Sequence, residues 1–394
     1  MKQVAKRALA TQAAGNDVVL IVSAMAGETN RLLKLAHDIS KLPDRREMDA
    51  LAATGEQVSA ALTAMAIHEL GGQARSFLGH QLKVLTDSAF TKARIKAIDA
   101  GKLNEALREG VVCVVAGFQG VDENGNITTL GRGGSDTSAV AVAAAIGADV
   151  CEIYTDVDGV YTTDPNICAS ARKIERISYE EMLELASLGA KVLQIRSVEL
   201  AMKYGVPVHV RSSFNDTPGT WVVGEEQSLE SVTVTGVAYD KGEARVMLVG
   251  VIDRPGIVAA LFGALSKENI SVDMIIQSPS RPTSLDAPPR TDVTFTVTKA
   301  DLARAKGVVN GLFAQFGADE VRYDENITKV SIVGLGMRSH AGVAARMFEL
   351  LFQEGINIQA ISTSEIKISC LVASEHAELA VRALHDGFGL GGGK

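Results

Sequence analysis

The strongest constraint on the fold is an internal repeat in the C-terminal part of the chain. Each copy starts with a Val-Gly pair, at 249–250 and 333–334, and leads to an apolar segment at 270–272 or 356–358. A second glycine, Gly256 in the first copy and Gly342 in the second, begins a stretch in which the two copies keep a constant offset. This offset pairs Phe262 with Phe348, Leu265 with Leu351, and Ile270 with Ile356. A chance match of this length is improbable, so the repeat predicts two copies of one small β-α-β module.

The first half of the chain alternates between helical and strand-like segments. Helices are expected at 1–14, 56–70 and 137–146, with another whose apolar face carries Leu32, Leu35, Ala36 and Ile39. Strands are expected at 18–23, 111–116, 151–155 and 206–211. Strands separated by helices are typical of an α/β fold with a mostly parallel sheet.

Length and charge narrow the class of protein. The 394 residues suggest two or three domains at about 150 residues each. The net charge of −8 disfavours non-specific nucleic-acid binding, which needs a basic surface. Apolar runs such as 139–148 are far shorter than the roughly 18 residues of a membrane-spanning helix, so no membrane partner is expected.

The cysteines and histidines are scattered along the sequence. Cys113, Cys151, Cys168 and Cys370 form no CxxC pair, and no two histidines form an HxxxH pair. Neither protein metal ligands nor a disulfide framework is therefore expected, and the cysteines fit a reducing cytosol. The basic, alanine-rich start at 1–15 is similar to a transit peptide, but it runs directly into a strand and is interpreted as a first helix.

A glycine-rich loop, Gly131-Arg132-Gly133-Gly134-Ser135-Asp136, precedes the helix expected at 137–146. Glycines let the main chain approach a ligand closely, and free N–H groups at a helix start attract an anion. Arg132 suits a carboxylate or a phosphate, while Asp136 suits Mg²⁺ or a helix cap. A plain capped loop explains Ser135 or Asp136 but not an arginine between glycines, so an anion site is favoured.

Acidic and aromatic side chains follow the strand at 151–155, namely Asp156, Asp158, Tyr161 and Asp164. Ligands of open α/β sheets bind beyond the carboxyl ends of strands. These carboxylates are therefore candidates for holding Mg²⁺ or a ribose, and Tyr161 for lying against a base. Asp-Gly and Asp-Pro pairs are also typical of turns, and the segment alone leaves both interpretations open.

Two further segments are ambiguous when they are read alone. Ser23 ends the strand at 18–23 and is followed by Gly-Glu-Thr-Asn-Arg at 27–31, where a turn and a helix cap are the simpler interpretation. Glu56 lies in the first turn of the helix at 56–70, where a carboxylate interacts favourably with the helix dipole. A glutamate directed into a cleft would instead receive a substrate ammonium group.

Taken in order, these motifs resemble those of the aspartate kinases of the amino-acid kinase family. The matching segments are 22–25, 55–56, 131–136, 155–161, 164–165 and 189–193. The repeated modules resemble two ACT domains, and Ile-Ser-Thr-Ser-Glu-Ile at 361–366 is a typical segment. The resemblance implies a three-layer kinase domain at 1–223 with a mainly parallel sheet. A linker at 224–231 and ferredoxin-like βαββαβ modules at 232–326 and 327–394 would follow.

The resemblance also implies an activity, the transfer of the ATP γ-phosphoryl group to the side-chain carboxylate of L-aspartate, with Mg²⁺ bound to the nucleotide. This would be the first step of lysine, threonine and methionine biosynthesis in the cytoplasm. Because the carboxylate is already a nucleophile, catalysis rests on positioning and charge neutralisation.

The same resemblance implies a role for each site residue. Glu56 would bind the amino group of aspartate and Arg132 its carboxylate, while Asp136 orients nearby groups. The other expected contacts are Ser23 near the phosphates, Gly27, Glu28, Thr29, Asn30 and Arg31 in a mobile loop on the substrate side, Gly133, Gly134 and Ser135 along the phosphoryl path, Thr155, Asp156, Tyr161, Thr162 and Asp164 at the nucleotide, and Lys191 beside the adenine.

Each repeated module opens its helix with residues that suit a ligand. These are Asp253, Pro255 and Gly256 in the first copy and Ser339, His340 and Gly342 in the second. Ordinary capping accounts for both groups, although a helix N-terminus also binds an amino-acid carboxylate. The ACT resemblance implies feedback inhibition by lysine, threonine or both, at a site between paired modules. It also implies a homo-oligomer or a heterotetramer with a regulatory subunit.

The sequence departs from the family pattern at two places. The family opens with a strand carrying Lys-Phe/Tyr-Gly-Gly-Thr-Ser, which this sequence lacks, so we expect a fragment or a start codon placed too far downstream. Asn166 stands where the family usually has arginine, with Arg172 or Lys173 as substitutes. Two alternatives stay open. One is a catalytically impaired fragment or an amino-acid-sensing regulatory subunit, and the other is another acid kinase acting on glutamate or its acetylated form. The paired modules argue against the second of these.

Overall fold

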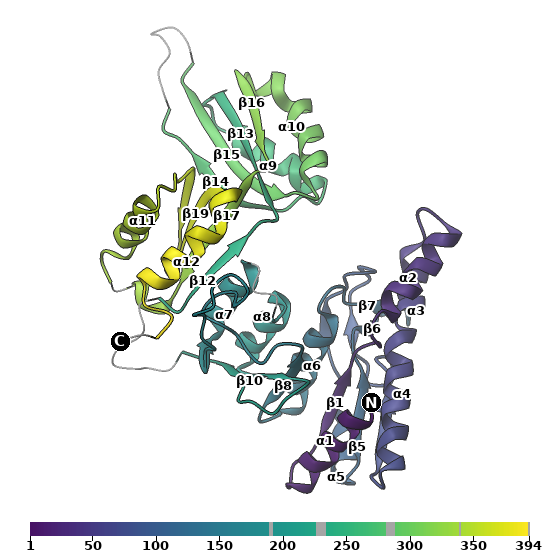
Figure 1. Cartoon of the computed structure of the whole chain (residues 1–394). Helices are drawn as coiled ribbons and strands as arrows, with labels where there is room; N and C mark the ends of the chain where they lie inside the picture. The colour runs from purple at the N-terminus through teal and green to yellow at the C-terminus, as the bar shows by residue number, and fades with distance from the viewer. Residues whose placement is uncertain (189–191, 226–233, 281–287, 339, 393–394) are drawn as a thin grey trace. The chain divides into compact units, whose positions relative to one another are not determined.

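The computed structural model describes residues 1–188, 192–225, 234–280, 288–338 and 340–392 (Figure 1). It divides into two compact units, of which the first comprises 1–160, 174–186 and 191–227 and the second 161–173, 187–190 and 228–394. Within the described ranges, none of the helices combines the length and apolar character needed to cross a membrane.

The first unit is an α/β unit in which strands alternate with helices. Its helices are α1 (Lys2–Ala13), α2 (Glu28–Ile39), α3 (Arg45–Ala52), α4 (Thr54–Glu69), α5 (Gly101–Arg108), α6 (Gly134–Ile146), α7 (Tyr179–Ser187) and α8 (Ile195–Tyr204). Its strands are β1 (Val19–Val22), β2 (Ala74–Phe77), β3 (Leu85–Thr86), β4 (Ile95–Ala97), β5 (Val112–Ala116), β6 (Gln119–Val121), β7 (Ile127–Thr129), β8 (Cys151–Thr155), β9 (Arg176–Ser178), β10 (Val208–Ser212) and β11 (Thr220–Val223).

These strands form three sheets, in the orders β1-β5-β2, β8-β10-β11-β9 and β4-β3-β6-β7. Both strand pairs of the first sheet are parallel, as are the pairs β8–β10, β9–β11 and β3–β6. The remaining pairs in this unit are antiparallel. The prediction of mainly parallel pairing is therefore confirmed, although the strands are divided among sheets.

Strand β5 lies at the centre of a three-layer arrangement. Every residue of this strand is buried, as the continuous apolar run predicts. Val112, Val114 and Ala116 pack in a cluster with apolar residues of α1 and α4. Cys113 and Val115 pack in a second cluster with residues of α5 and α6. Because side chains alternate along a strand, this one segment contributes to the cores on both faces of the sheet.

The second unit contains the repeated modules. Its strands are β12 (Gly236–Asp240), β13 (Glu243–Ile252), β14 (Val272–Gln277), β15 (Arg290–Thr298), β16 (Glu320–Asp324), β17 (Ile327–Val333), β18 (Ala360–Thr363) and β19 (Lys367–Ala373). Its helices are α9 (Ile257–Lys267), α10 (Leu302–Phe316), α11 (Val343–Gln353) and α12 (Ala377–Gly387), with short 3₁₀ helices η1 (Leu335–Arg338) and η2 (Ser374–His376).

The first module has the predicted βαββαβ order, from β13 through α9, β14, β15 and α10 to β16. Its strands form one antiparallel sheet in the order β14-β15-β13-β16. The second sheet has the order β12-β17-β19-β18. Its edge strand β12 precedes the whole first module in the sequence, whereas we expected residues 232–326 to belong to that module. The boundary at 327 is therefore wrong for β12, because Gly236–Asp240 pairs with Lys329–Val333.

The repeat inferred from the sequence has the same backbone in both copies. Gly256 and Gly342 precede α9 and α11 in the left-handed region, with φ of 94° and 96°. A glycine adopts this conformation at little cost, which explains why both copies carry it. The paired residues Leu265 and Leu351 are at most 1% exposed and lie in the cores of their modules.

Candidate functional site

The candidate catalytic residues of the first unit gather at the carboxyl edge of the β1-β5-β2 sheet. Strands β1 and β5 run parallel, with Val22 opposite Ala116. Just beyond these strands, the amide of Gly117 donates a 3.0 Å hydrogen bond to the carbonyl of Val22. The exposed Ser23 therefore follows β1 at the edge where open α/β sheets bind ligands.

The glycine-rich loop closes directly onto α6. The helix begins at Gly134, three residues before the expected start at 137, because Gly133 takes a left-handed φ of 67° as the N-cap. A Cβ at residue 133 would lie 1.9 Å from Cγ of Gln194, so a larger residue does not fit there. No side chain caps α6, and the amide of Gly134 already donates to the carbonyl of Gly131 at 3.0 Å. Among the described residues, the amides of Ser135 and Asp136 in the same turn have no acceptor and are therefore available to an anion.

Gly117 is a site residue that the sequence reasoning missed. A Cβ at this position would lie 3.1 Å from Oγ of Ser135 and 3.0 Å from Cγ2 of Ile21. This close approach brings the start of α6 against the ends of β1 and β5. A glycine directly after the continuous apolar run at 111–116 was the signal that could have identified it.

Glu56, in the first turn of α4, lies at the same edge of the sheet, beside the residues that follow β1. Its side chain is 3% exposed, and Oε1 accepts a 3.0 Å hydrogen bond from the amide of Ala24. Oε2 is buried and has no hydrogen-bond partner among the described residues. Burial raises the pKa of this carboxyl, and the amide of Ala24 partly opposes the increase. A buried carboxylate oxygen without a partner is costly unless a ligand completes it.

Asp49 shows what a structural carboxylate looks like in the same unit. It is 1% exposed, and its two oxygens accept hydrogen bonds of 2.7 to 3.0 Å from the amides of Thr91 and Thr129 and the hydroxyl of Thr129. Burial raises its pKa as it does that of Glu56. The difference between the two groups is that Asp49 is satisfied by the protein and Glu56 is not.

Arg132 and Asp136 flank the start of α6 and differ in environment. Arg132 is exposed, and within the described ranges no hydrogen bond or ion pair engages its guanidinium. Asp136 is half-buried, and burial raises its pKa to about 6. Arg196 fixes the residue before the loop, because its guanidinium donates to the carbonyl of Leu130 at 2.5 Å and to that of Ala93 at 2.9 Å.

The segment at 27–31 is a helix start and not the loop we expected. Gly27 is the N-cap, with φ of 79°, and Glu28 to Arg31 form the first turn of α2. Arg31 donates to both carboxylate oxygens of Glu28, at 2.8 and 2.7 Å. The local turn-and-cap interpretation was therefore correct for this segment. Thr29 and Asn30 lie in the same turn.

The expected nucleotide contacts are divided between the two units. Thr155 ends β8 in the first unit, and its hydroxyl donates a 3.1 Å hydrogen bond to the exposed Asp156. Tyr161, Thr162 and Asp164 belong to the second unit. Lys191, with its neighbours at 189–190, lies outside the described residues.

Two of these side chains are already engaged within the second unit. Thr162 is 6% exposed, and its hydroxyl accepts the amide of Arg172. Asp164 accepts hydrogen bonds from the amide and the side chain of Asn166 at 2.9 and 3.0 Å. The turn interpretation of the Asp-Pro pair is thus correct at Asp164, and the departure at Asn166 contributes to that turn.

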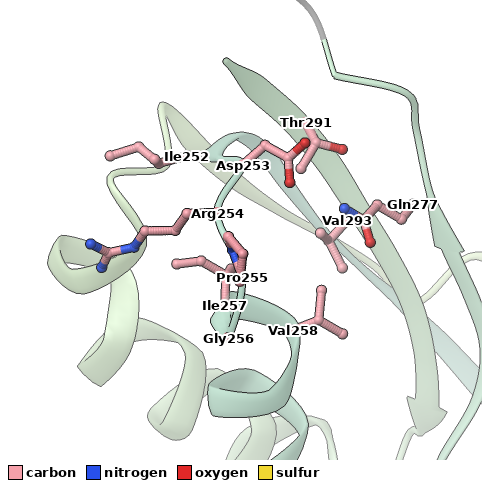
Figure 2. Close-up of a pocket in the computed structure, with 10 residues that line it drawn as sticks. All are labelled: Ile252, Asp253, Arg254, Pro255, Gly256, Ile257, Val258, Gln277, Thr291 and Val293. Carbon is pink, nitrogen blue, oxygen red and sulfur yellow. The ribbon is translucent and has the colours of Figure 1, made fainter. Parts of the chain in front are cut away.

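A pocket of about 410 Å³ lies at the start of α9 in the first module. Figure 2 shows Asp253, Thr291 and Gln277 around this hollow, with Pro255 and Gly256 at the helix start and the guanidinium of Arg254 extending away. No side chain caps α9. The pocket therefore combines a half-buried carboxylate with free helical N–H groups, a pair suited to a zwitterionic ligand.

The equivalent start of α11 has the same backbone but different side chains. Gly342 is its N-cap, and the exposed His340 has Nδ1 2.7 Å from the carbonyl of Gly336. Ser339 lies outside the described residues. Of the two groups of expected effector residues, the first therefore lines a pocket.

The sequence matches two family models. Residues 1–212 match the amino acid kinase family, and residues 246–313 and 330–388 match the ACT domain. An aspartate kinase of Stutzerimonas stutzeri is 54% identical over 391 residues, covering 99% of this chain and 93% of that protein. An aspartokinase of Corynebacterium glutamicum is 50% identical over 395 residues, with coverages of 100% and 93%.

Solved structures agree with these matches. Escherichia coli aspartokinase III in complex with aspartate and ADP, in the R-state, has a TM-score of 0.80 at 27% identity, covering 98% of this chain and 95% of that chain. Its complex with lysine and aspartate, in the T-state, has a TM-score of 0.75 at 26% identity, with the same coverages. The family and the fold class predicted from the motifs are confirmed.

Proposed function

Because the chain belongs to the amino acid kinase family, and within it to the aspartokinases with ACT domains, we propose that the edge of the β1-β5-β2 sheet transfers the ATP γ-phosphoryl group to L-aspartate. The relatives' shared name supports the reaction class. The observation that carries the proposal is the unpartnered, buried Oε2 of Glu56. It lies at the edge that also holds the uncapped start of α6.

Aspartate is held at its two charged ends. Its ammonium group binds Oε2 of Glu56, where it supplies the missing hydrogen bond and offsets the buried negative charge. Its α-carboxylate binds the guanidinium of Arg132, whose fork matches a carboxylate. These contacts leave the side-chain carboxylate free to face the nucleotide.

The transfer itself needs no activated protein nucleophile. A side-chain oxygen of aspartate attacks the γ-phosphorus, and the bond from that phosphorus to the bridging oxygen breaks, so ADP leaves and an acyl phosphate forms. At the helix start, Gly133 and Gly134 let the backbone approach the phosphoryl group, and the N–H group of Ser135 is offered to the negative charge that develops on the phosphoryl oxygens. Asp136 is ionised above its pKa of about 6 and orients neighbouring groups.

The nucleotide is placed by residues that follow β8. Thr155 and Asp156 lie at the carboxyl end of that strand, and Tyr161 and Asp164 follow within ten residues. Asp156 is an exposed carboxylate of the kind that Mg²⁺ accepts directly or through water. When bound with ATP, Mg²⁺ supplies charge neutralisation at the phosphates. Ser23 is the nearest hydroxyl in sequence to the end of β1 and is proposed to contact the phosphates.

The activity is tested with Arg132→Ala in an ATP-dependent aspartyl hydroxamate assay. The variant should lose at least about a hundredfold in kcat/KM for aspartate, because a bidentate charged contact disappears from a site that depends on positioning. Arg108→Ala changes another exposed arginine, on α5, and should leave turnover unchanged. Equal turnover of Arg132→Ala and the unmodified chain would refute the proposed aspartate site.

Regulation is proposed at the first-module pocket. A lysine or threonine effector places its carboxylate at the start of α9 and its ammonium group on Asp253. Asp253→Ala should raise the effector concentration for half-inhibition about tenfold while the uninhibited rate stays within twofold. Asp319→Ala removes a carboxylate of the same module outside the pocket lining and is the matched control. Identical inhibition curves for Asp253→Ala and the unmodified chain would exclude this site.

An aspartate kinase inhibited by lysine or threonine would catalyse the first step of lysine, threonine and methionine biosynthesis.

Assembly is proposed through the edge strands of the two modules. Ile275 on β14 and Ile361 on β18 occupy equivalent repeat positions, and they are 51% and 42% exposed. Exposed apolar side chains on unpaired edges favour pairing with a second copy. Ile275→Lys with Ile361→Lys should lower the mass measured by light scattering, and an unchanged mass would exclude these edges.

All four cysteines are free, as suits a reducing cytoplasm.

A further inference from the structure

The segment 161–173 is part of the kinase family match, yet it packs with the second unit. It forms a short hairpin in which Tyr161 bridges Lys173 and the amide of Thr162 donates to the carbonyl of Arg172 at 2.8 Å. The amide of Val237 on β12 donates to the carbonyl of Thr162 at 2.7 Å. The hairpin is thus bonded to the edge strand of the second module's sheet.

His385 on α12 contacts three side chains of this hairpin. The ring is fully buried, and Nε2 lies 2.9 Å from Oγ1 of Thr162. On its other side, Nδ1 lies 3.4 Å from both Sγ of Cys168 and Oγ of Ser170. A neutral imidazole offers one N–H and one lone pair, so it can bond on both sides without a buried charge. Burial lowers its pKa, which favours that neutral form.

Further contacts bind the hairpin to the same module. The side chain of Arg172 donates from Nε to the carbonyl of Leu390 at 2.9 Å. The hydroxyl of Tyr239 donates to Oδ2 of Asp164 at 3.1 Å. Ile167 packs on the apolar core of the module. The contacts that His385 makes with Thr162 and Cys168 are buried, and they engage both halves of the segment 161–173.

A metal site is a weaker interpretation of the same cluster. Ligand atoms of Cys168, His385 and Asp386 lie within 4.8 Å of one another. However, the Asp386 side chain is 70% exposed and follows His385 directly in the helix. Only two buried donors remain, fewer than the three or four that a protein zinc site uses.

We propose that His385 is a positioning residue for nucleotide binding. It holds the hairpin 161–173 on the second module and thereby fixes the conformation in which Tyr161 meets ATP. Thr162 is then a contact of His385 and not of the nucleotide. The inference rests on the proposed function in so far as this hairpin carries nucleotide contacts. Because α12 lies in the second ACT match, a displacement of that helix would reach the hairpin through His385 without passing through the aspartate-binding residues.

The test compares two amide replacements that each preserve one side of the ring. His385→Gln places an amide where Nε2 lies and keeps the hydrogen bond to Thr162. His385→Asn places its amide where Nδ1 lies, so it keeps only the contact with Cys168 and loses the one with Thr162. His385→Asn should raise KM for ATP about fivefold or more, leaving KM for aspartate within twofold, and His385→Gln should restore most of the loss. Thr162→Val removes the same contact and also the acceptor of the Arg172 amide, so it should raise KM for ATP at least as much as His385→Asn. The double variant should lose less than the sum of the two single losses. His376→Asn, at an exposed histidine of the same module, is the control.

Hydrogen exchange separates this inference from the proposed activity. In the full chain without ligands, His385→Asn should speed amide exchange in 161–173 at least about tenfold, with the strands of the first unit unchanged. Unchanged protection in the hairpin would overturn the proposal, as would equal increases in both KM values. If no variant turned over aspartate while the exchange result held, the proposed activity would fail and the anchoring role would stand.

Discussion

The main-chain amide of Ala24 and the carboxylate of Glu56 are joined by a 3.0 Å hydrogen bond between segments 32 residues apart. The bond fixes one oxygen of a buried carboxylate at the end of β1 and leaves the other without a partner among the described residues. The amide determines the direction of the side chain, while the free oxygen is the one that we propose to bind a cationic group.

Glu56→Gln should impair substrate binding without weakening the fold. The amide oxygen still accepts from Ala24, but the charge that attracts the ammonium group is lost, so KM for aspartate should rise about ten- to hundredfold. The free energy of unfolding should stay equal or increase, because a buried charge is removed. Asp49→Asn is the matched control, since its oxygens serve the protein alone. It should lose about 2–4 kcal/mol of stability with KM unchanged. Similar stability losses in both variants would contradict the distinction.

Asp136→Asn should stabilise the chain in a pH-dependent way. Burial raises the pKa of this carboxyl from 3.8 to about 6, so the folded state binds its proton more tightly. The proton bound in the folded state stabilises the fold below pH 3.8, and this stabilisation is lost as the pH rises from 3.8 to about 6. Above that range the buried carboxylate is charged, and the free energy of unfolding is lowered by the full amount. In urea unfolding at about pH 7.5, the free energy of unfolding of Asp136→Asn should exceed that of the unmodified chain by about 1–2 kcal/mol. This is less than the free energy that corresponds to the whole pKa shift, because the side chain is partly solvated. Near pH 4 the gain should vanish, and activity should be lower. An equal gain at both pH values would show that the charge is not its cause.

Lys329→Met should destabilise the contact between the two modules. The Lys329 side chain is 4% exposed and lies 2.5 Å from Glu243, with Asp273 as a second partner. Without the lysine a buried carboxylate loses its counter-charge, at a cost of about 3–5 kcal/mol. Burial already raises the pKa of Glu243, so acidification should protonate it and reduce the loss. Thermal unfolding of Lys241→Met, at an exposed ion pair, is the control and should change by less than about 1 kcal/mol. A loss of stability that does not change with pH would indicate that Lys329→Met acts through lost packing and not through the unpaired charge.

The sequence predicted much of the backbone around the candidate site because its motifs are local. A left-handed glycine before a helix, an arginine between glycines and an acidic segment after a strand are set by neighbouring residues. The same locality explains the success at Gly256 and Gly342, where one backbone requirement recurs. It also explains the error at 27–31, where the family expectation of a loop displaced a correct local prediction of a helix cap.

What the sequence determined by itself was the alternation of strands and helices, the repeat and the residue types at the sheet edge, since periodicity and turn chemistry act over a few positions. The tertiary structure alone decided that β12 joins the second sheet, that Glu56 faces Ala24, and that the hairpin at 161–173 packs on His385. These contacts join residues up to 223 positions apart. They depend on which strand edges pair and on which polar groups remain buried after packing. A local sequence pattern predicts neither of these.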